Sequence, residues 1–133
     1  MSDRALHILL VEDDPDDVEL LQTAFEDNHV APEFTVIYQG DKVLPYLEEA
    51  GQLPDTIVLD LNLPKLHGKE ILQLLALSPY GKIPVIVLTT SSSKADIDFC
   101  MSLGVKHYET KPTSMRDYYS ICDKILSVAN ASA

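Results

Sequence analysis

The stretch LLVEDDPDD, residues 9–17, joins an apolar run to a segment with five carboxylates among six residues. An apolar run of this kind is typical of a buried strand. Carboxylates crowded at the end of a buried strand repel one another, which disfavours their ionised forms. The sequence therefore predicts that a compensating group lies beside them.

The chain has the size and composition of one globular domain. Its 133 residues are 46% hydrophobic and 23% charged, as in typical soluble domains. We expect a single domain over residues 1–133, with no output domain. The net charge of −11 disfavours binding to nucleic acid, whose phosphates would repel the protein.

The apolar stretch near the N-terminus does not indicate a membrane segment. Residues 5–11 are interrupted by His7 and are followed by acids. The stretch is therefore too short to span a bilayer, and it lacks the cleavage pattern of a signal peptide. We expect a cytoplasmic protein that does not contact membranes.

The cysteines and histidines do not form a recognisable site in the sequence. Cys100 and Cys122 make no CxxC pair and fall in helical patterns, which predicts buried thiols. The four histidines show no i,i+4 pairing and no clustering with cysteine, so zinc is not expected.

Short apolar runs alternate with amphipathic segments along the chain. Runs that are apolar throughout are typical of strands covered on both faces. The expected strands are His7–Val11, Phe34–Tyr38, Thr56–Leu61, Pro84–Leu88 and Val105–Tyr108. This alternation predicts an α/β fold with a parallel sheet, right-handed crossovers and helices on both faces.

Capping residues predict where several helices begin and end. Asp14 followed by Pro15 predicts the start of the first helix. Asp41 predicts the start of the second, in which Pro45 would cost an early hydrogen bond. Apolar residues at helical spacing indicate three more helices, around residues 71–75, 97–101 and 115–129. Gly104 predicts the end of the fourth helix.

Charged and hydroxyl side chains stand where four of the expected strands end. They are Glu12 and Asp13 after the first strand, Asp60 at the end of the third, Thr89 after the fourth and Lys111 after the fifth. In an open α/β sheet, ligands bind beyond the carboxyl ends of the strands, where the strand order reverses. If the first and third strands are neighbours, three carboxylates converge beside a hydroxyl and an ammonium.

Such a cluster predicts a site for a hard metal ion. Three like charges at close range call for a cation, and an all-oxygen set favours Mg²⁺ or Mn²⁺ over zinc. Lys111 can pair with Asp60 or with an oxygen of a bound phosphoryl group. Asp16 and Asp17 are expected to complement the dipole of the first helix.

Each of these residues also has an ordinary structural explanation. An acid after a strand is common, Thr89 suits a β-strand and Lys111 suits a protein surface. The functional interpretation depends on complementary groups at four strand ends together.

Four motifs, in this order, resemble the receiver domains of two-component response regulators. They are VEDD at 11–14, LDLNLPKLHG at 59–68, PVIVLTT at 84–90 and YETKP at 108–112. The resemblance implies a flavodoxin-like (βα)5 doubly wound parallel sheet with strand order 2-1-3-4-5. The LNLPK segment and the chain length also resemble the small regulators that accompany bacterial phytochromes. His67 stands where receiver domains frequently have an acid.

The resemblance implies a phosphoacceptor and its metal ligands. Asp60 would accept the phosphoryl group, Asp13 would ligate Mg²⁺ (or Mn²⁺) directly, and Glu12 would help through water. Asn62 would contribute its backbone carbonyl, and Lys111 would bind a phosphoryl oxygen.

The resemblance also implies a conformational switch. Thr89 would move toward the phosphoryl group, and Tyr108 would swing inward with it. The Lys111–Pro112 peptide bond would be cis.

The implied function is temporary phosphorylation rather than enzymatic turnover. A phosphoryl group would pass to Asp60 from a phosphohistidine of a sensor histidine kinase or a phosphotransfer protein. The chain would assist its own phosphorylation and dephosphorylation.

The signal is then expected to leave through the surface of helix 4, strand 5 and helix 5, toward a protein target or a homodimer partner. One hypothesis places an apolar patch there, formed by Ile97, Met101, Tyr108 and Ile121. The alternative is that all four are core residues.

Three other functions share part of this pattern. A carrier of FMN would have the same fold, but acids replace its phosphate-binding loop after the first strand. An aspartyl-phosphate phosphatase typically has a second acid two residues after the nucleophile, where this chain has Asn62. The third alternative is an interaction module that works without phosphorylation. It is disfavoured because the chain has the complete set of acids that a phosphorylated receiver domain would need.

Overall fold

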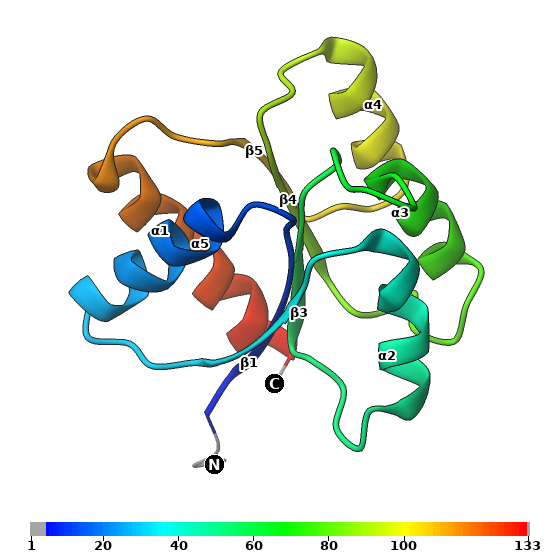
Figure 1. The fold of residues 1–133 in the computed structure, drawn as a ribbon, viewed down its shortest axis with the longest axis horizontal. Helices are drawn as coiled ribbons and strands as arrows, with labels where there is room; N and C mark the ends of the chain where they lie inside the picture. The colour runs from blue at the N-terminus through cyan, green and yellow to red at the C-terminus, as the bar shows by residue number, and fades with distance from the viewer. Residues whose placement is uncertain (1–4, 133) are drawn as a thin grey trace.

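Five short strands form a parallel sheet between two layers of helices (Figure 1) in the computed structural model, which describes residues 5–132. The strands are β1 (His7–Val11), β2 (Glu33–Ile37), β3 (Thr56–Leu59), β4 (Val85–Thr89) and β5 (His107–Thr110). The helices are α1 (Pro15–Asp27), α2 (Val43–Glu49), α3 (Gly68–Ala76), α4 (Lys94–Ser102) and α5 (Met115–Ser132), with a 3-10 turn η1 (Gly40–Lys42). The strand order β2-β1-β3-β4-β5 confirms the expected fold. Among helices within residues 5–132, none is both long and apolar enough to cross a bilayer.

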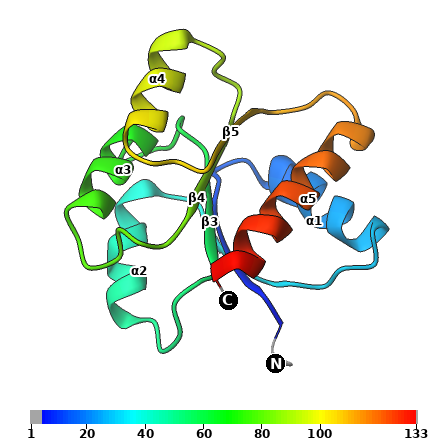
Figure 2. The same ribbon diagram turned by 180° about the vertical axis from the view of Figure 1, so that it is seen from behind.

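Successive residues of each strand point to opposite faces of the sheet and therefore belong to two different cores. In β1, Leu9 and Val11 pack with the helices α2, α3 and α4, whereas Ile8 and Leu10 pack with α1 and α5. Figures 1 and 2 show these two helical layers on opposite sides of the sheet. Cover on both faces explains why the inner strands β1, β3 and β4 are almost entirely apolar and buried. The edge strands β2 and β5 are less buried and include polar residues.

The fifth strand begins and ends later than the sequence pattern predicted. Val105 is buried, but it precedes β5, which extends through polar residues to Thr110. Thr110 pairs with Thr89 of β4. The apolar pattern therefore predicted the burial of Val105 correctly. The bounds of β5 depend instead on the pairing of its backbone with β4, which the pattern does not show. The second strand is shifted in the opposite direction, one residue earlier than predicted, to Glu33–Ile37.

Side chains cap the first and third helices at their N-termini. Asp14 accepts a hydrogen bond from the N–H of Asp16 (2.9 Å), and Pro15 is the first residue of α1, as predicted. At the start of α3, Nδ1 of His67 accepts from the N–H of Lys69 (3.1 Å). The imidazole of His67 thus does the capping that an acid performs at many helix starts.

The predicted cap at Asp41 is wrong. Asp41 lies inside η1, and α2 begins at Val43 without a side-chain cap. Pro45 is then the third residue of α2, where the backbone N–H lacks a partner within the helix in any case. The expected loss of a hydrogen bond at Pro45 therefore does not occur. Gly104, two residues after the end of α4, has a φ of +86°, the left-handed conformation that ends many helices, as predicted.

Ile121 of α5 is a core residue. Its side chain is 3% exposed and packs in the core beneath α1 and α5. The hypothetical patch of Ile97, Met101, Tyr108 and Ile121 therefore loses its basis, because Ile121 faces the sheet rather than solvent. Met101 is 47% exposed, and Ile97 and Tyr108 are half-buried.

Gly40 allows the turn after β2 to meet the loop after β3. Its N–H donates to the carbonyl of Pro64 (3.2 Å). A Cβ atom at Gly40 would lie 2.0 Å from the carbonyl oxygen of Leu66. The backbone of Leu66 cannot move away by rotating a side chain, so this position requires glycine.

Substitution Gly40→Ala should lower the free energy of unfolding by about 2 kcal/mol or more, because the new methyl group overlaps backbone atoms. Urea unfolding followed by circular dichroism measures the change. Gly51→Ala is the matched control, since a Cβ there meets nothing within 4 Å. Equal stability of the two variants would contradict the prediction.

Both cysteines should be unreactive in the folded protein. Cys100 and Cys122 are free and 0% and 1% exposed, and burial raises the pKa of each, that of Cys122 to about 12. Because only the thiolate reacts, Ellman's reagent at pH 8 should label neither cysteine in the native protein and both in denaturant. Rapid labelling of either thiol in the native protein would show that its burial is wrong.

Candidate functional site

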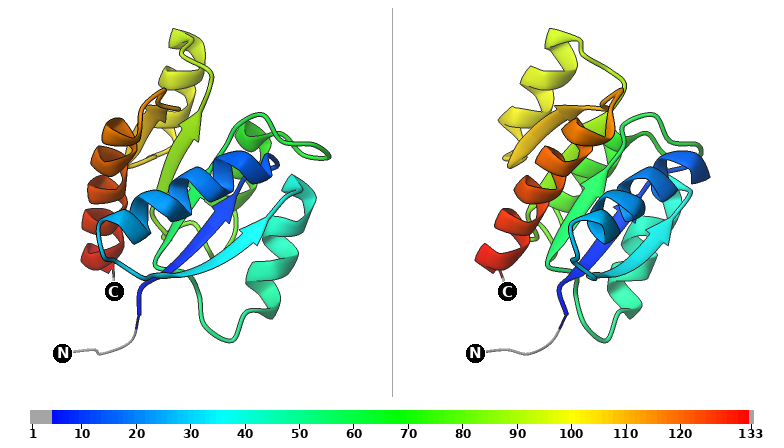
Figure 3. Two further views of the ribbon diagram at one scale, coloured as in Figure 1. Left: turned by 60° about the vertical axis from the view of Figure 1, so that its left-hand side comes forward. Right: turned by 90° about the vertical axis from the view of Figure 1, so that its left-hand side faces the viewer.

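The candidate site lies where the strand order reverses. The strand β1 pairs with β2 on one side and with β3 on the other. Connections leave this point in opposite directions, which opens a crevice beyond the carboxyl ends of the strands. Figure 3 shows β1 and β3 running side by side toward this edge of the sheet.

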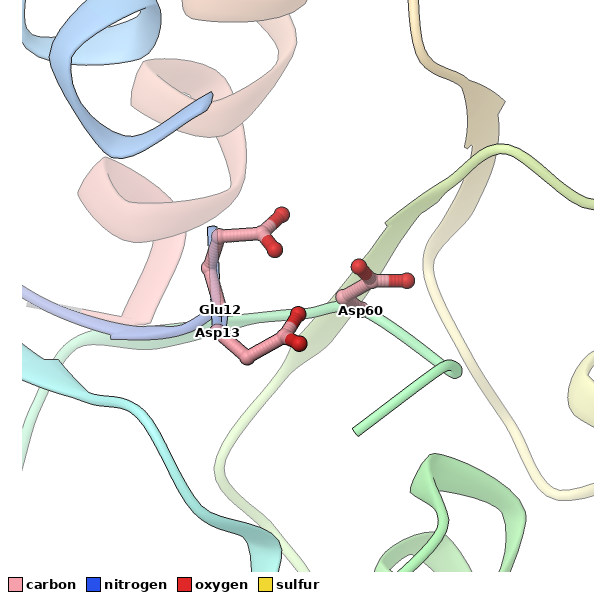
Figure 4. A group of neighbouring side chains, drawn as sticks. All are labelled: Glu12, Asp13 and Asp60. Atoms are coloured by element: carbon pink, nitrogen blue, oxygen red, sulfur yellow. The ribbon is translucent and has the colours of Figure 1, made fainter. Parts of the chain in front are cut away.

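Three carboxylates converge at this edge, as the sequence predicted. Glu12, Asp13 and Asp60 each offer an oxygen, and these oxygens lie within 4.8 Å of one another. Figure 4 shows the side chains extending from the ends of β1 and β3 toward a common region. Glu12 and Asp60 are buried, at 3% and 4% exposure, whereas Asp13 is exposed.

Lys111 is a compensating cation for this cluster. Its Nζ lies 2.7 Å from Glu12 Oε1, 3.0 Å from Asp60 Oδ2 and 2.7 Å from Asp17 Oδ2. The backbone N–H of Lys111 donates to the carbonyl of Thr89 (2.7 Å), which fixes where the side chain starts. One ammonium therefore contacts three carboxylates.

Asp17 belongs to the site as well as to the helix start. It lies in the first turn of α1, as expected from its effect on the helix dipole. The sequence interpretation missed its contact with Lys111. Asp17 follows the cap Asp14 by three residues, but the N–H of Asp14 donates to Glu12 Oε2 (3.1 Å) and not to Asp17. The partner of Asp17 lies 94 residues away in sequence, so no local pattern identifies this contact.

The two buried carboxylates have opposite pKa shifts. Burial raises the pKa of Glu12 to about 7, since it outweighs the hydrogen bond from Lys111, and repulsion from Asp60 adds to it. Burial also acts to raise the pKa of Asp60, but hydrogen bonds from Lys111 and from the Asn62 N–H outweigh it, so this pKa is lowered. The pKa of Lys111 is raised, because hydrogen bonds to Asp17, Glu12 and Asp60 outweigh the effect of burial.

Backbone and hydroxyl groups orient the Asp60 carboxylate. The N–H of Asn62 donates to Asp60 Oδ1 (3.1 Å), and Lys111 contacts Oδ2. The fully buried hydroxyl of Thr89 lies near Asp60 and also helps to lower the pKa of its carboxyl. The amide side chain of Asn62 donates to the hydroxyl of Thr90 (3.4 Å). The predicted proximity of Thr89 to Asp60 is thus confirmed.

Tyr108 lies against the loop between β4 and α4. Its hydroxyl donates to the carbonyl of Ser91 (2.8 Å), and its ring packs against the core beneath α2, α3 and α4. This is an inward position. The implied swing of Tyr108 between two positions stays a prediction.

The Lys111–Pro112 bond is trans, since no peptide bond within residues 5–132 is cis. The cis bond implied by the resemblance is therefore wrong for this structure. The trans isomer of an X–Pro bond is favoured by about 0.5–1 kcal/mol. With this isomer, the ammonium of Lys111 contacts Glu12, Asp17 and Asp60.

The chemistry of the carboxylate cluster fits a hard divalent cation. The ligand atoms of Glu12, Asp13 and Asp60 are oxygens, with no thiolate or imidazole among them, and such a set favours Mg²⁺ or Mn²⁺. Exposure of Asp13 leaves one side open for water and phosphate, which Mg²⁺ keeps in most protein sites. The role of the Asn62 carbonyl as a further ligand stays a prediction.

Comparisons with known proteins agree with this geometry. The family model for the response regulator receiver domain matches residues 8–123. The response regulator Rcp1 from Synechocystis sp. is 34% identical over 126 residues, which cover 90% of this chain and 86% of Rcp1. The solved structure of the phosphorylated cyanobacterial phytochrome response regulator RcpA has a TM-score of 0.85 and 34% identity, and the match covers 98% of this chain and 97% of that one. The Mn²⁺-bound form of Rcp1 has a TM-score of 0.80 at 34% identity, and 92% of each chain is covered.

The family model, the relatives and the strand order all describe the same kind of molecule. The chain belongs to the response regulator receiver domain family of two-component signalling.

Proposed function

We propose that this chain is a Mg²⁺-dependent phosphoacceptor and that Asp60 receives the phosphoryl group. The main support is the convergence of Glu12, Asp13 and Asp60 around the crevice, with Lys111 bound to Asp60. A carboxylate acts as a nucleophile only when it is ionised. The contacts from Lys111 and the Asn62 N–H, which lower the pKa of Asp60, favour that state.

Phosphoryl transfer forms one bond and breaks another. An oxygen of Asp60 attacks the phosphorus of a phosphohistidine, the P–N bond breaks, and the imidazole keeps the electron pair and takes up a proton. Lys111 then binds one phosphoryl oxygen, and the hydroxyl of Thr89 donates to another. Water later attacks the phosphorus, the bond from phosphorus to the Asp60 oxygen breaks, and inorganic phosphate leaves.

A cation held by Glu12, Asp13 and Asp60 would neutralise the negative charge on the phosphoryl oxygens. The Mn²⁺-bound structure of the similar protein Rcp1 supports such a site in this chain. We propose Mg²⁺ as the ion, with Mn²⁺ as the alternative, because the three clustered side chains offer only carboxylate oxygens.

The phosphoryl donor would be a sensor histidine kinase or a phosphotransfer protein. Similarity to the phytochrome response regulator RcpA supports a kinase linked to a phytochrome. The chain would assist its own phosphorylation and dephosphorylation without acting as an enzyme on other substrates. The surface formed by α4, β5 and α5, where Met101 is exposed, would carry the signal to a protein target or to a second copy of the chain.

Incubation with acetyl phosphate and Mg²⁺ should add one phosphoryl group to the wild type, because small acyl phosphates can replace the protein donor. Intact mass spectrometry measures the adduct. It should not form when EDTA replaces Mg²⁺ in the incubation, and it should be absent from Asp60→Asn, which keeps the size of the side chain but is not a nucleophile. An adduct on Asp60→Asn would contradict the assignment of Asp60.

Mg²⁺ should stabilise the wild type against urea, because a ligand that binds only the folded state adds its binding free energy. The gain should approach about 1.4 kcal/mol for each tenfold excess over the dissociation constant. Asp13→Asn should lose most of this gain, since it removes an anionic oxygen from the cluster. Asp16→Asn is the matched control, because Asp16 is a nearby exposed acid outside the cluster. An equal loss in both variants would indicate nonspecific charge effects instead of a site.

A further inference from the structure

A series of polar contacts outside the carboxylate site joins α3, α4 and the loop between β4 and α4. Lys69 of α3 forms an ion pair with Asp96 of α4, and Figures 1 and 2 show these helices side by side. Asp96 also accepts the hydroxyl hydrogen of Ser91 (2.5 Å). The carbonyl of Ser91 in turn accepts from Tyr108 (2.8 Å). We call the first three residues the Lys69–Asp96–Ser91 network.

Lys69 occupies a position that its own helix disfavours. It is the second residue of α3, where the helix dipole favours negative charge. Its ammonium contacts Asp96 and also lies 5.6 Å from the centre of the Phe99 ring, a distance at which a cation attracts an aromatic face. Both partners belong to α4. These contacts compensate for the unfavourable place of Lys69 in its own helix, and they attach α4 to α3.

The helix α4 has little apolar contact to hold it in place. Cys100 is its one fully buried residue, whereas α1 buries Val18, Leu21, Ala24 and Phe25. Segments with few buried apolar contacts move at a lower cost in free energy. Polar contacts at the start of α4 therefore have a large share in fixing its position.

Ser91 connects this network to the candidate site. Its N–H donates to the hydroxyl oxygen of Thr89 (3.5 Å), the side chain that is predicted to move toward the phosphoryl group. The carbonyl of Ser91 binds Tyr108, and its hydroxyl binds Asp96. A single residue thus contacts both side chains of the proposed switch and the network that attaches α4.

We propose that Lys69 and Asp96 are positioning residues, which hold Ser91 and the start of α4 in the arrangement that receives the phosphoryl group. This inference rests on the proposed function. In the structure, the network coexists with the hydrogen bond from Tyr108 to the Ser91 carbonyl and with the hydrogen bond from the Ser91 N–H to the Thr89 hydroxyl. Contacts made in one arrangement and lost in another shift the population toward the first.

The affinity for beryllium fluoride in the presence of Mg²⁺, measured by NMR titration, tests the proposal. Lys69→Met and Asp96→Asn should each bind about three- to tenfold more weakly than the wild type, a range typical of contacts within one network. The double variant should show little further loss, because either change already breaks the network. Asp98→Asn is the matched control, since it removes the same charge from α4 at an exposed pair with Lys94.

Two further measurements separate positioning from general destabilisation. The conservative variant Lys69→Arg should keep the wild-type affinity for beryllium fluoride, because its guanidinium can still pair with Asp96. In protein without beryllium fluoride, the Tyr108 ring resonances should shift in Lys69→Met and Asp96→Asn, and should not shift in Asp98→Asn.

Wild-type affinity and an unshifted Tyr108 in Lys69→Met and Asp96→Asn would overturn the inference. If the wild type itself failed to bind beryllium fluoride, the proposed function would fail. The Tyr108 resonances would then decide separately whether the network positions the loop.

Discussion

The contact of one ammonium with three carboxylates is the interaction on which this site depends. Lys111 joins Asp17 of α1 to Asp60, which follows β3, and to Glu12, which follows β1. Loss of the ammonium would leave buried carboxylates unpaired, which is strongly destabilising. Lys111 is 94 residues from Asp17 and 51 residues from Asp60 in sequence. Charge compensation therefore ties together segments that the chain itself keeps far apart.

The sequence predicted the sheet and most of the site because both follow from local patterns. Apolar runs show where strands are buried on both faces, and parallel strands bring their carboxyl ends to one edge. Polar residues at those ends, such as Asp13, Asp60 and Lys111, must then be neighbours. The convergence seen in the structure is thus a consequence of where each strand stops.

Features that depend on contacts between distant segments were not predictable in the same way. Asp41 has the residue type of a cap, but Gly40 is bonded to the loop after β3, and the chain turns before the helix begins. Ile121 lies at the margin of the apolar face of α5, and only packing beneath α1 shows that it is buried. The pair formed by Lys69 and Asp96 has no sequence pattern, because the two helices meet only in the folded chain.

The alternation of each strand between two cores has a consequence for how this sequence can change. Neighbouring residues such as Leu9 and Leu10 belong to opposite cores. A substitution by an apolar residue of similar volume changes the packing of one core only, and only to a limited extent. Loss of one residue from β1 would instead exchange the two faces and would carry Glu12 away from the end of the strand. Divergence of this chain should therefore proceed by substitution within strands of constant length, while insertions and deletions accumulate in the loops at the opposite edge of the sheet.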